Sequence, residues 1–151
     1  MQKTTKAIGS KELYQQDLVA WCSDTVAKLK ASNFSEIDID SLIEEIEGLA
    51  GHDRRELESC LEILLNHLLK RMYVDSPNNY RGWERTIREQ CRQLQKLLKQ
   101  SPSLRNSWME TFSELWVNAL ADAREDYPDT EFPDEWQFSR ESDLLLSEKL
   151  W

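Results

Sequence analysis

Glycine and proline are scarce in this chain of 151 residues, which contains four of each. Both residues interrupt regular structure and form turns, so their scarcity argues against a protein of many short strands joined by tight turns. Leucine, glutamate, lysine, arginine and glutamine are abundant instead, and all of them favour helices. The composition therefore predicts an all-α protein.

Long apolar runs are also missing. No stretch approaches the roughly 20 apolar residues that a membrane-spanning helix needs, and the opening residues contain no apolar run typical of a signal peptide. The only cysteines, Cys22, Cys60 and Cys91, fall on predicted apolar helical faces and are expected to be reduced core thiols. We therefore expect a cytoplasmic protein with no membrane partner.

Catalytic and cofactor motifs are absent as well. The chain has no glycine-rich phosphate loop, no Cys-x-x-Cys pair and no Gly-x-Ser-x-Gly turn. It also lacks the Glu-x-x-His motif of carboxylate-bridged metal bundles, and it has two histidines in all. These absences weigh against an enzyme and predict no cofactor and no metal. Weak candidates for metal ligands are Glu44, Glu47, His52, Glu56 and His67.

Apolar residues recur at intervals of three and four in four segments, as in amphipathic helices. The predicted main helices span residues 10–31, 40–73, 80–99 and 102–126. Residues 1–9 are expected to form a disordered tail, and residues 127–151 a partly irregular arm with a short final helix after Ser139. Ser10, Asp40, Asn78 or Asn79, and Ser101 are the expected helix caps. Together these segments predict a single domain, residues 10–151, folded as an up-and-down helical bundle.

The helix predicted for residues 40–73 contains Gly48 and Gly51, each of which costs about 1 kcal/mol relative to alanine. Its apolar stripe keeps one phase across both glycines, which favours one helix, bent or straight, over two shorter ones. The stripe widens in the second half, so that half is expected to be the more buried.

Some polar residues fall on or beside these apolar faces. Asp53 and Arg71 lie inside the stripe of residues 40–73 and His67 lies at its margin. Asp53 and His67 are about 21 Å apart along the axis, so each needs its own partner from another helix. Satisfied core groups are the first interpretation, and a cleft with a general base is the alternative. The polar core or cleft candidates are Asp53, His67, Arg71, Thr86 and Glu89.

Charge is unevenly distributed around a net charge of −9. Residues 36–62 contain ten acids and two bases, and residues 110–148 contain twelve acids and two bases. Between them, six cations share one side of the helix predicted for residues 80–99. This basic ladder consists of Arg81, Arg85, Arg88, Arg92, Lys96 and Lys99. Pairing with acidic helices of this chain or of a second subunit is the first interpretation, and tracking of phosphates is the second.

Four strings carry a family resemblance. They are "LYQQDLVAW", "FSEIDIDSLIEEIEGLA", "RRELESCLEILLNHLLKRMY" and "RGWERTIREQCRQLQKLLKQSPSL". In order and spacing they resemble the bacterial, especially cyanobacterial, domain of unknown function family number twenty-nine. The resemblance implies an all-helical cytoplasmic protein and supplies no activity, cofactor or catalytic residue. Where relatives often have Lys-Trp, this chain reads Lys70 to Tyr73, so Tyr73 would replace that aromatic residue if it closes a pocket.

The leading functional prediction is a non-catalytic helical interaction protein that self-associates, as a homodimer, through charge-complementary helices. A small enzyme or metal-binding bundle that uses glutamate and histidine residues is the first alternative. Nucleic-acid binding through the basic ladder is the second alternative, and the acidic net charge disfavours it.

Overall fold

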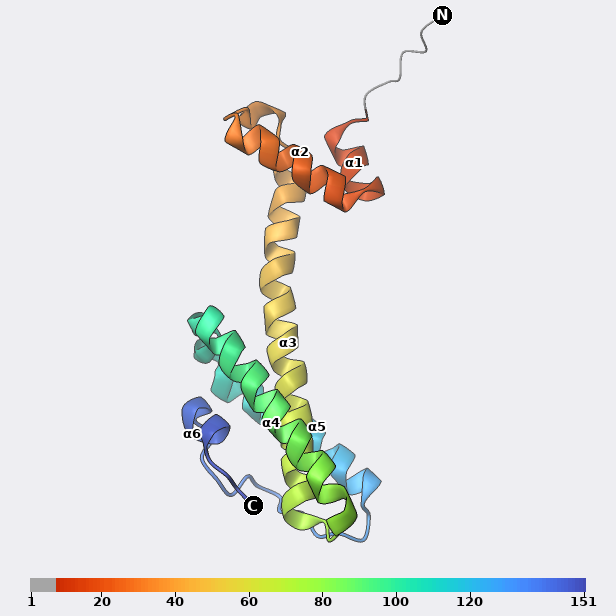
Figure 1. The fold of residues 1–151 in the computed structure, drawn as a ribbon, viewed down its shortest axis with the longest axis vertical. Helices are drawn as coiled ribbons and strands as arrows, with labels where there is room; N and C mark the ends of the chain where they lie inside the picture. Colours follow the sequence, from red (N-terminus) through yellow and green to blue (C-terminus); the bar gives the residue numbers. More distant parts are fainter. Residues whose placement is uncertain (1–7) are drawn as a thin grey trace, which may run out of the picture. The chain divides into compact units, whose positions relative to one another are not determined.

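The computed structural model describes residues 8–151, so the predicted tail of residues 1–9 lies mostly outside the described residues. The described part contains helices and no strand, which confirms the all-α prediction (Figure 1). The α-helices are α1 (Ser10–Gln16), α2 (Leu18–Lys30), α3 (Ile39–Tyr73), α4 (Pro77–Gln100), α5 (Trp108–Asp126) and α6 (Ser142–Ser147). Short 3₁₀ turns cover Phe34–Glu36 and Pro102–Ser107.

The chain divides into two compact units where one domain was expected from the sequence. The N-terminal unit comprises residues 1–51 and the C-terminal unit comprises residues 52–151. The division falls inside α3, which is one continuous helix of 35 residues. The two units are described separately below.

The N-terminal unit begins with two helices where the sequence predicted one over residues 10–31. Asp17 adopts an extended backbone conformation (φ −149°, ψ 92°), and its carboxylate accepts a hydrogen bond from the Ala20 amide at 3.0 Å. An aspartate in this position caps a new helix because its oxygen satisfies an unpaired amide of the first turn. The prediction of an unbroken helix was therefore wrong at Asp17. Tyr14 of α1 and Trp21 of α2 pack edge to face across the break, with ring centroids 4.8 Å apart.

Three of the predicted caps differ from the observed ones by one to three residues, and Ser101 precedes a 3₁₀ turn rather than α5. The carboxylate of Asp38, rather than Asp40, accepts from the Ser41 amide at 3.3 Å and opens α3. Ser76 precedes α4, with Pro77 in its first turn, so that helix starts before Asn78. Pro102 opens the 3₁₀ turn and α5 begins at Trp108. The helix expected over residues 102–126 thus ends where predicted and starts later.

The C-terminal unit contains the packed core. The later part of α3 lies alongside α4 and α5, and α6 lies near α4 (Figure 1). The core cluster runs from Leu57 to Leu146 and includes fully buried leucines of α3 and α4, such as Leu64 and Leu94. On α5, Phe112 is fully buried. The second half of α3 is therefore the more buried half, as the sequence predicted.

The irregular arm after α5 is anchored by tryptophan side chains. Trp136 is buried against Phe112 and Trp116, with ring centroids 5.7 and 5.5 Å away. The indole N–H of Trp108 donates to the Arg140 carbonyl at 2.7 Å, and that of Trp116 donates to the Asp134 carbonyl at 3.2 Å. Each pairing satisfies a polar atom that would otherwise be costly to bury. The arm is thus part of the C-terminal core.

The N-terminal unit buries little by comparison. Trp21 and Ile37 are its buried large apolar side chains, and Cys22 is exposed. The prediction of a core thiol was wrong for Cys22 because the face of α2 that carries it has no covering element in this unit. Cys60 is buried and Cys91 is half-buried. Among residues 8–151, no helix combines the length and the hydropathy that crossing a bilayer requires.

Candidate functional site

The three glutamates that open α3 do not converge on a histidine. Glu44 and Glu47 are exposed. Glu45 is half-buried and accepts a hydrogen bond from the Tyr14 hydroxyl at 2.7 Å. That bond, helped by burial and by the charges of Glu44 and Glu45, raises the pKa of Tyr14 to about 12. No feature of the sequence pointed to the Tyr14 pairing, because the two residues are 31 positions apart.

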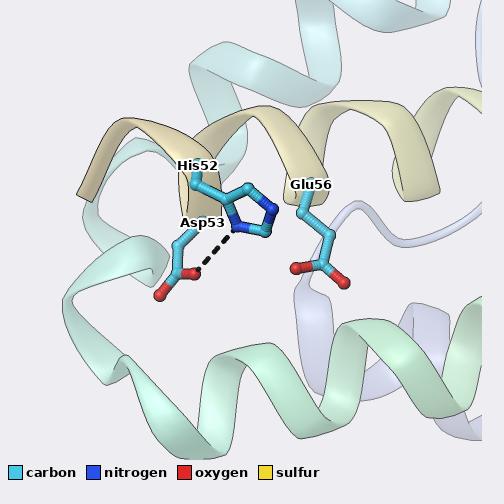
Figure 2. Close-up of side chains that lie close together, drawn as sticks. All are labelled: His52, Asp53 and Glu56. Carbon is cyan, nitrogen blue, oxygen red and sulfur yellow. Dashed lines mark ion pairs between the residues drawn. The ribbon is translucent and has the colours of Figure 1, made fainter. Parts of the chain in front are cut away.

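Three side chains in the first turns of the C-terminal unit do converge. His52, Asp53 and Glu56 each offer a ligand atom, and these atoms all lie within 4.8 Å of one another. The His52 ring lies between the two carboxylates, and Nδ1 is 3.7 Å from the Asp53 Oδ1 (Figure 2). In the described residues, this is the one such group of three or more histidine, cysteine or acidic side chains. The group contains two of the five weak metal candidates from the sequence, His52 and Glu56, together with Asp53.

Residues of and next to α4 hold both carboxylates of this group. The Ser101 hydroxyl donates to the Asp53 Oδ2 at 3.3 Å, and the Gln93 side-chain amide donates to the Glu56 Oε1. Asp53 therefore has a partner at the end of another helix. The apolar period of α3 showed that Asp53 faces inward, but the register of α4 against α3 decides which residue it meets, and one sequence does not specify that register.

His67 lies elsewhere, in a hollow of about 330 Å³ between α3 and α5. Its Nδ1 is 2.8 Å from the Ile63 carbonyl oxygen, so this nitrogen donates and Nε2 is left as the acceptor. Burial, helped by the charge of Lys70, lowers the pKa of His67 and favours the neutral ring, although the Ile63 bond opposes that shift. The other residues that line the hollow are Ser59, Glu62, Ile63, Asn66, Asp122, Glu125 and Asp126. Its carboxylates do not form a three-ligand group with His67.

The remaining polar candidates are engaged separately and do not form one cleft. The Arg71 guanidinium donates to the Glu84 carboxylate at 2.8 Å and lies 3.9 Å from the centre of the Tyr80 ring. The bond from Arg71 lowers the pKa of Glu84. Thr86 donates to the Gly82 carbonyl within its own helix at 3.3 Å. Glu89 is exposed and lies 3.8 Å from Arg85.

All six cations of the basic ladder are exposed along α4. Arg88 and Arg92 also form one edge of a groove of about 420 Å³ between α4 and the α6 region. Leu68, Ile87, Cys91, Leu145, Leu146 and Trp151 supply its apolar surface. Two residues of the ladder therefore line a partly apolar groove, which the sequence did not predict because α6 is distant from α4 in the chain.

Tyr73, the aromatic residue expected to close a pocket, packs edge to face on Phe132 with ring centroids 6.2 Å apart. It also lines a hollow of about 360 Å³ with Arg71, Met72, Phe138, Leu150 and Trp151. Burial raises the pKa of the Tyr73 hydroxyl. Tyr73 thus shares a hollow with Arg71, on the surface formed by the end of α3 and the arm.

The comparisons with known proteins point to a family and not to an activity. No curated protein and no solved structure matches the chain. The model of one family, described as a domain of unknown function, matches residues 13–151 and so covers nearly the whole sequence. The chain therefore belongs to the DUF29 family.

Proposed function

We propose that this chain is a non-catalytic helical interaction protein that self-associates through its N-terminal unit. The observation that carries the proposal is the distribution of exposed apolar side chains. Among residues 8–151, fifteen large apolar side chains are exposed, and ten of them fall between Ile8 and Leu49. Isolated exposed apolar residues are normal, but a contiguous set marks an interaction surface.

The exposed apolar residues of α3 form a stripe. Ile39, Ile43 and Ile46 are 48–58% exposed and recur every three or four residues, so they share one side of the helix. Asp40, Glu44 and Glu47 follow one flank of that stripe at the same spacing, and all three are exposed. We call these six residues the acidic stripe. It is an apolar ridge with carboxylates along one edge.

The groove beside α4 in the C-terminal unit is the counterpart of that pattern. Apolar side chains make up about half of its lining, and Arg88 and Arg92 of the basic ladder, with Lys149, supply positive charge. Glu84 and Glu148 also line the groove, and the Glu84 carboxylate is already paired with Arg71. An apolar ridge with an acidic edge thus complements an apolar groove with a basic edge, as in recognition of an amphipathic helix by a groove.

Charge complementarity makes a second copy of the chain the occupant of each surface. The described residues of the N-terminal unit carry nine acids and three bases, a net charge of −6, so that unit repels another N-terminal unit. The ladder of a second copy offers six cations. If each copy inserts its acidic stripe into the groove of the other, the two contacts are identical and the assembly closes as a two-fold dimer.

Light scattering over a range of protein concentrations tests the proposal, with measurements at low and high salt. We expect a dimer that weakens as salt rises, because exposed charges are screened. Replacing Ile43 and Ile46 with glutamine removes the apolar ridge and keeps good helix formers, so dimerisation should fall at least tenfold. Replacing Met109 and Val117 with glutamine is the matched control, since both side chains are exposed on α5 outside either surface.

Charge reversal gives a sharper test. Arg88→Glu with Arg92→Glu should abolish dimers, and Glu44→Lys with Glu47→Lys should do the same. A mixture of the two double variants should form heterodimers, because each contact then again joins opposite charges. A monomer at every concentration and salt would refute self-association, and a mixture that stays monomeric while the wild type dimerises would refute the stripe-and-groove contact.

A second ladder variant tests the nucleic-acid alternative. Phosphate tracking predicts that the wild type binds a labelled duplex at low salt, with affinity that falls steeply as salt rises. Arg85→Glu with Arg92→Glu should then lose that binding. We expect no binding by the wild type, because the net charge of −9 repels the duplex.

A further inference from the structure

The group formed by His52, Asp53 and Glu56 has a use that self-association does not require. His52 and Glu56 are one turn apart on α3 and so share one side of that helix. Asp53 and Glu56 contact residues of and next to α4, and the exposed His52 ring lies between their carboxylates (Figure 2). One imidazole and two carboxylates are a ligand set that divalent transition metals accept. The question is whether the carboxylates have oxygens to offer.

Each carboxylate is held by one oxygen and leaves the other available. Asp53 uses Oδ2 to accept from Ser101, and Glu56 uses Oε1 to accept from Gln93. In the described residues neither Asp53 Oδ1 nor Glu56 Oε2 accepts a hydrogen bond. Hydrogen bonds of this kind orient ligating carboxylates in metal sites and raise metal affinity. Ser101 and Gln93 therefore orient the two carboxylates in the way that residues around a metal site orient its ligands.

The charge of the group is also uncompensated. Within residues 8–151, no lysine or arginine forms an ion pair with Asp53 or Glu56, and the His52 Nδ1 is 3.7 Å away, beyond hydrogen-bonding distance. The His52 side chain is 70% exposed, so an ion can reach the site and water can complete its coordination. A divalent cation would neutralise both carboxylates.

We propose that His52, Asp53 and Glu56 form a binding site for a divalent transition-metal ion, with Zn²⁺ as the reference ion and water as the fourth ligand. Two ligands that each lie about 2.1 Å from an ion are at most about 4.2 Å apart. The ligand atoms here lie within 4.8 Å of one another, so a small rotation of the exposed His52 side chain completes the site.

Calorimetric titration of the full chain with ZnCl₂ tests the site, after stripping with a chelator and removal of any histidine tag. A Cys22→Ser background excludes the exposed thiol as a ligand. We expect one equivalent to bind. His52→Gln and Glu56→Gln should each weaken binding at least tenfold, and His67→Gln is the matched control that should leave it unchanged.

Optical spectra with Co²⁺ supply an independent measurement. Absorption bands of coordinated Co²⁺ should appear at one equivalent and should be lost in His52→Gln. Circular dichroism of each variant verifies that α3 is intact, which is expected because His52 is exposed. Absence of Zn²⁺ binding, or binding that His52→Gln and Glu56→Gln leave unchanged, would overturn the site. Neither result bears on self-association, which the oligomeric state tests separately.

Discussion

The two compact units of this chain both consist of amphipathic helices, but they differ in how much of the apolar helical surface they bury. The C-terminal unit buries twenty-four apolar residues in one core cluster, whereas the N-terminal unit buries Trp21 and Ile37. Both have apolar residues at helical spacing, and α3 contributes to both. The difference is that α4, α5 and the arm cover the later half of α3, while α1 and α2 leave the acidic stripe exposed. The apolar period of a helix thus identifies its apolar face, but it does not show which element packs against that face.

The three cysteines give the largest expected contrast between the units. Cys22 is exposed, whereas Cys60 is buried and burial raises its thiol pKa. Burial raises the pKa of Cys91 to about 11, which further suppresses its reactive thiolate. At pH 8 we expect Cys22 to react with a disulfide reagent roughly 1,000-fold faster than the other two, because Cys60 requires opening of the core and Cys91 has little thiolate.

Stopped-flow absorbance of the thiol that the reagent releases measures the three rates. Cys22→Ser should remove the fast phase alone. Three thiols that react at one rate would show that the C-terminal core opens as readily as the N-terminal unit.

Removal of a core aromatic side chain should damage the C-terminal unit severely. Phe112 is fully buried and packs on Trp136 and under the Arg140 guanidinium, 5.2 Å from the ring centre. Phe112→Ala should lower the free energy of unfolding by about 3–5 kcal/mol. Chemical denaturation followed by circular dichroism measures the loss. Val117→Ala on the same helix is the control: its side chain is 64% exposed, and the change should stay within about 0.5 kcal/mol. Equal losses would contradict the assignment of the core.

Much of the fold could be predicted because helical period and helix-breaking residues are local signals. The continuity of α3 through Gly48 and Gly51, the burial of its later half, and the final helix at Leu144 all follow from such signals. The break at Asp17 does not show in the apolar period, because the period continues through it. The exposure of Cys22 was missed because period alone does not reveal whether a face is covered.

The site was less predictable because it depends on pairing between distant segments. Asp53 faces inward by period, but its Ser101 partner is 48 residues away. The partner of Glu45 was missed for the same reason. In contrast, His52 and Glu56 lie one turn apart on a single helix, which is why the sequence could suggest them as joint ligands.

A glycine substitution distinguishes the stabilities of the two units more finely. A β-carbon at Gly48 or Gly82 would meet no atom within 4 Å, so alanine fits at both positions. Each change should stabilise its helix by about 0.5–1 kcal/mol. Gly48→Ala should slow hydrogen exchange in the first half of α3 without shifting unfolding of the C-terminal core, whereas Gly82→Ala should raise the denaturation midpoint of that core. If Gly48→Ala raised that midpoint equally, the units would unfold together.

The smallest effect concerns the Tyr14–Glu45 bond, which joins α1 to α3 in the N-terminal unit. The pKa of the Tyr14 hydroxyl is about 12, above its ordinary value of 10.0. The folded state therefore holds the phenol proton more tightly than the unfolded chain does. This contribution to stability is complete below pH 10 and is lost as the pH rises through about 12.

Absorbance near 295 nm, taken as the difference between the wild type and Tyr14→Phe, follows ionisation of the Tyr14 hydroxyl. In Glu45→Gln the pKa should fall toward 10, whereas Glu47→Gln, whose side chain does not bond Tyr14, should leave it unchanged. Ionisation of Tyr14 at its ordinary pH in the wild type would show that α1 is not held to α3 by this bond.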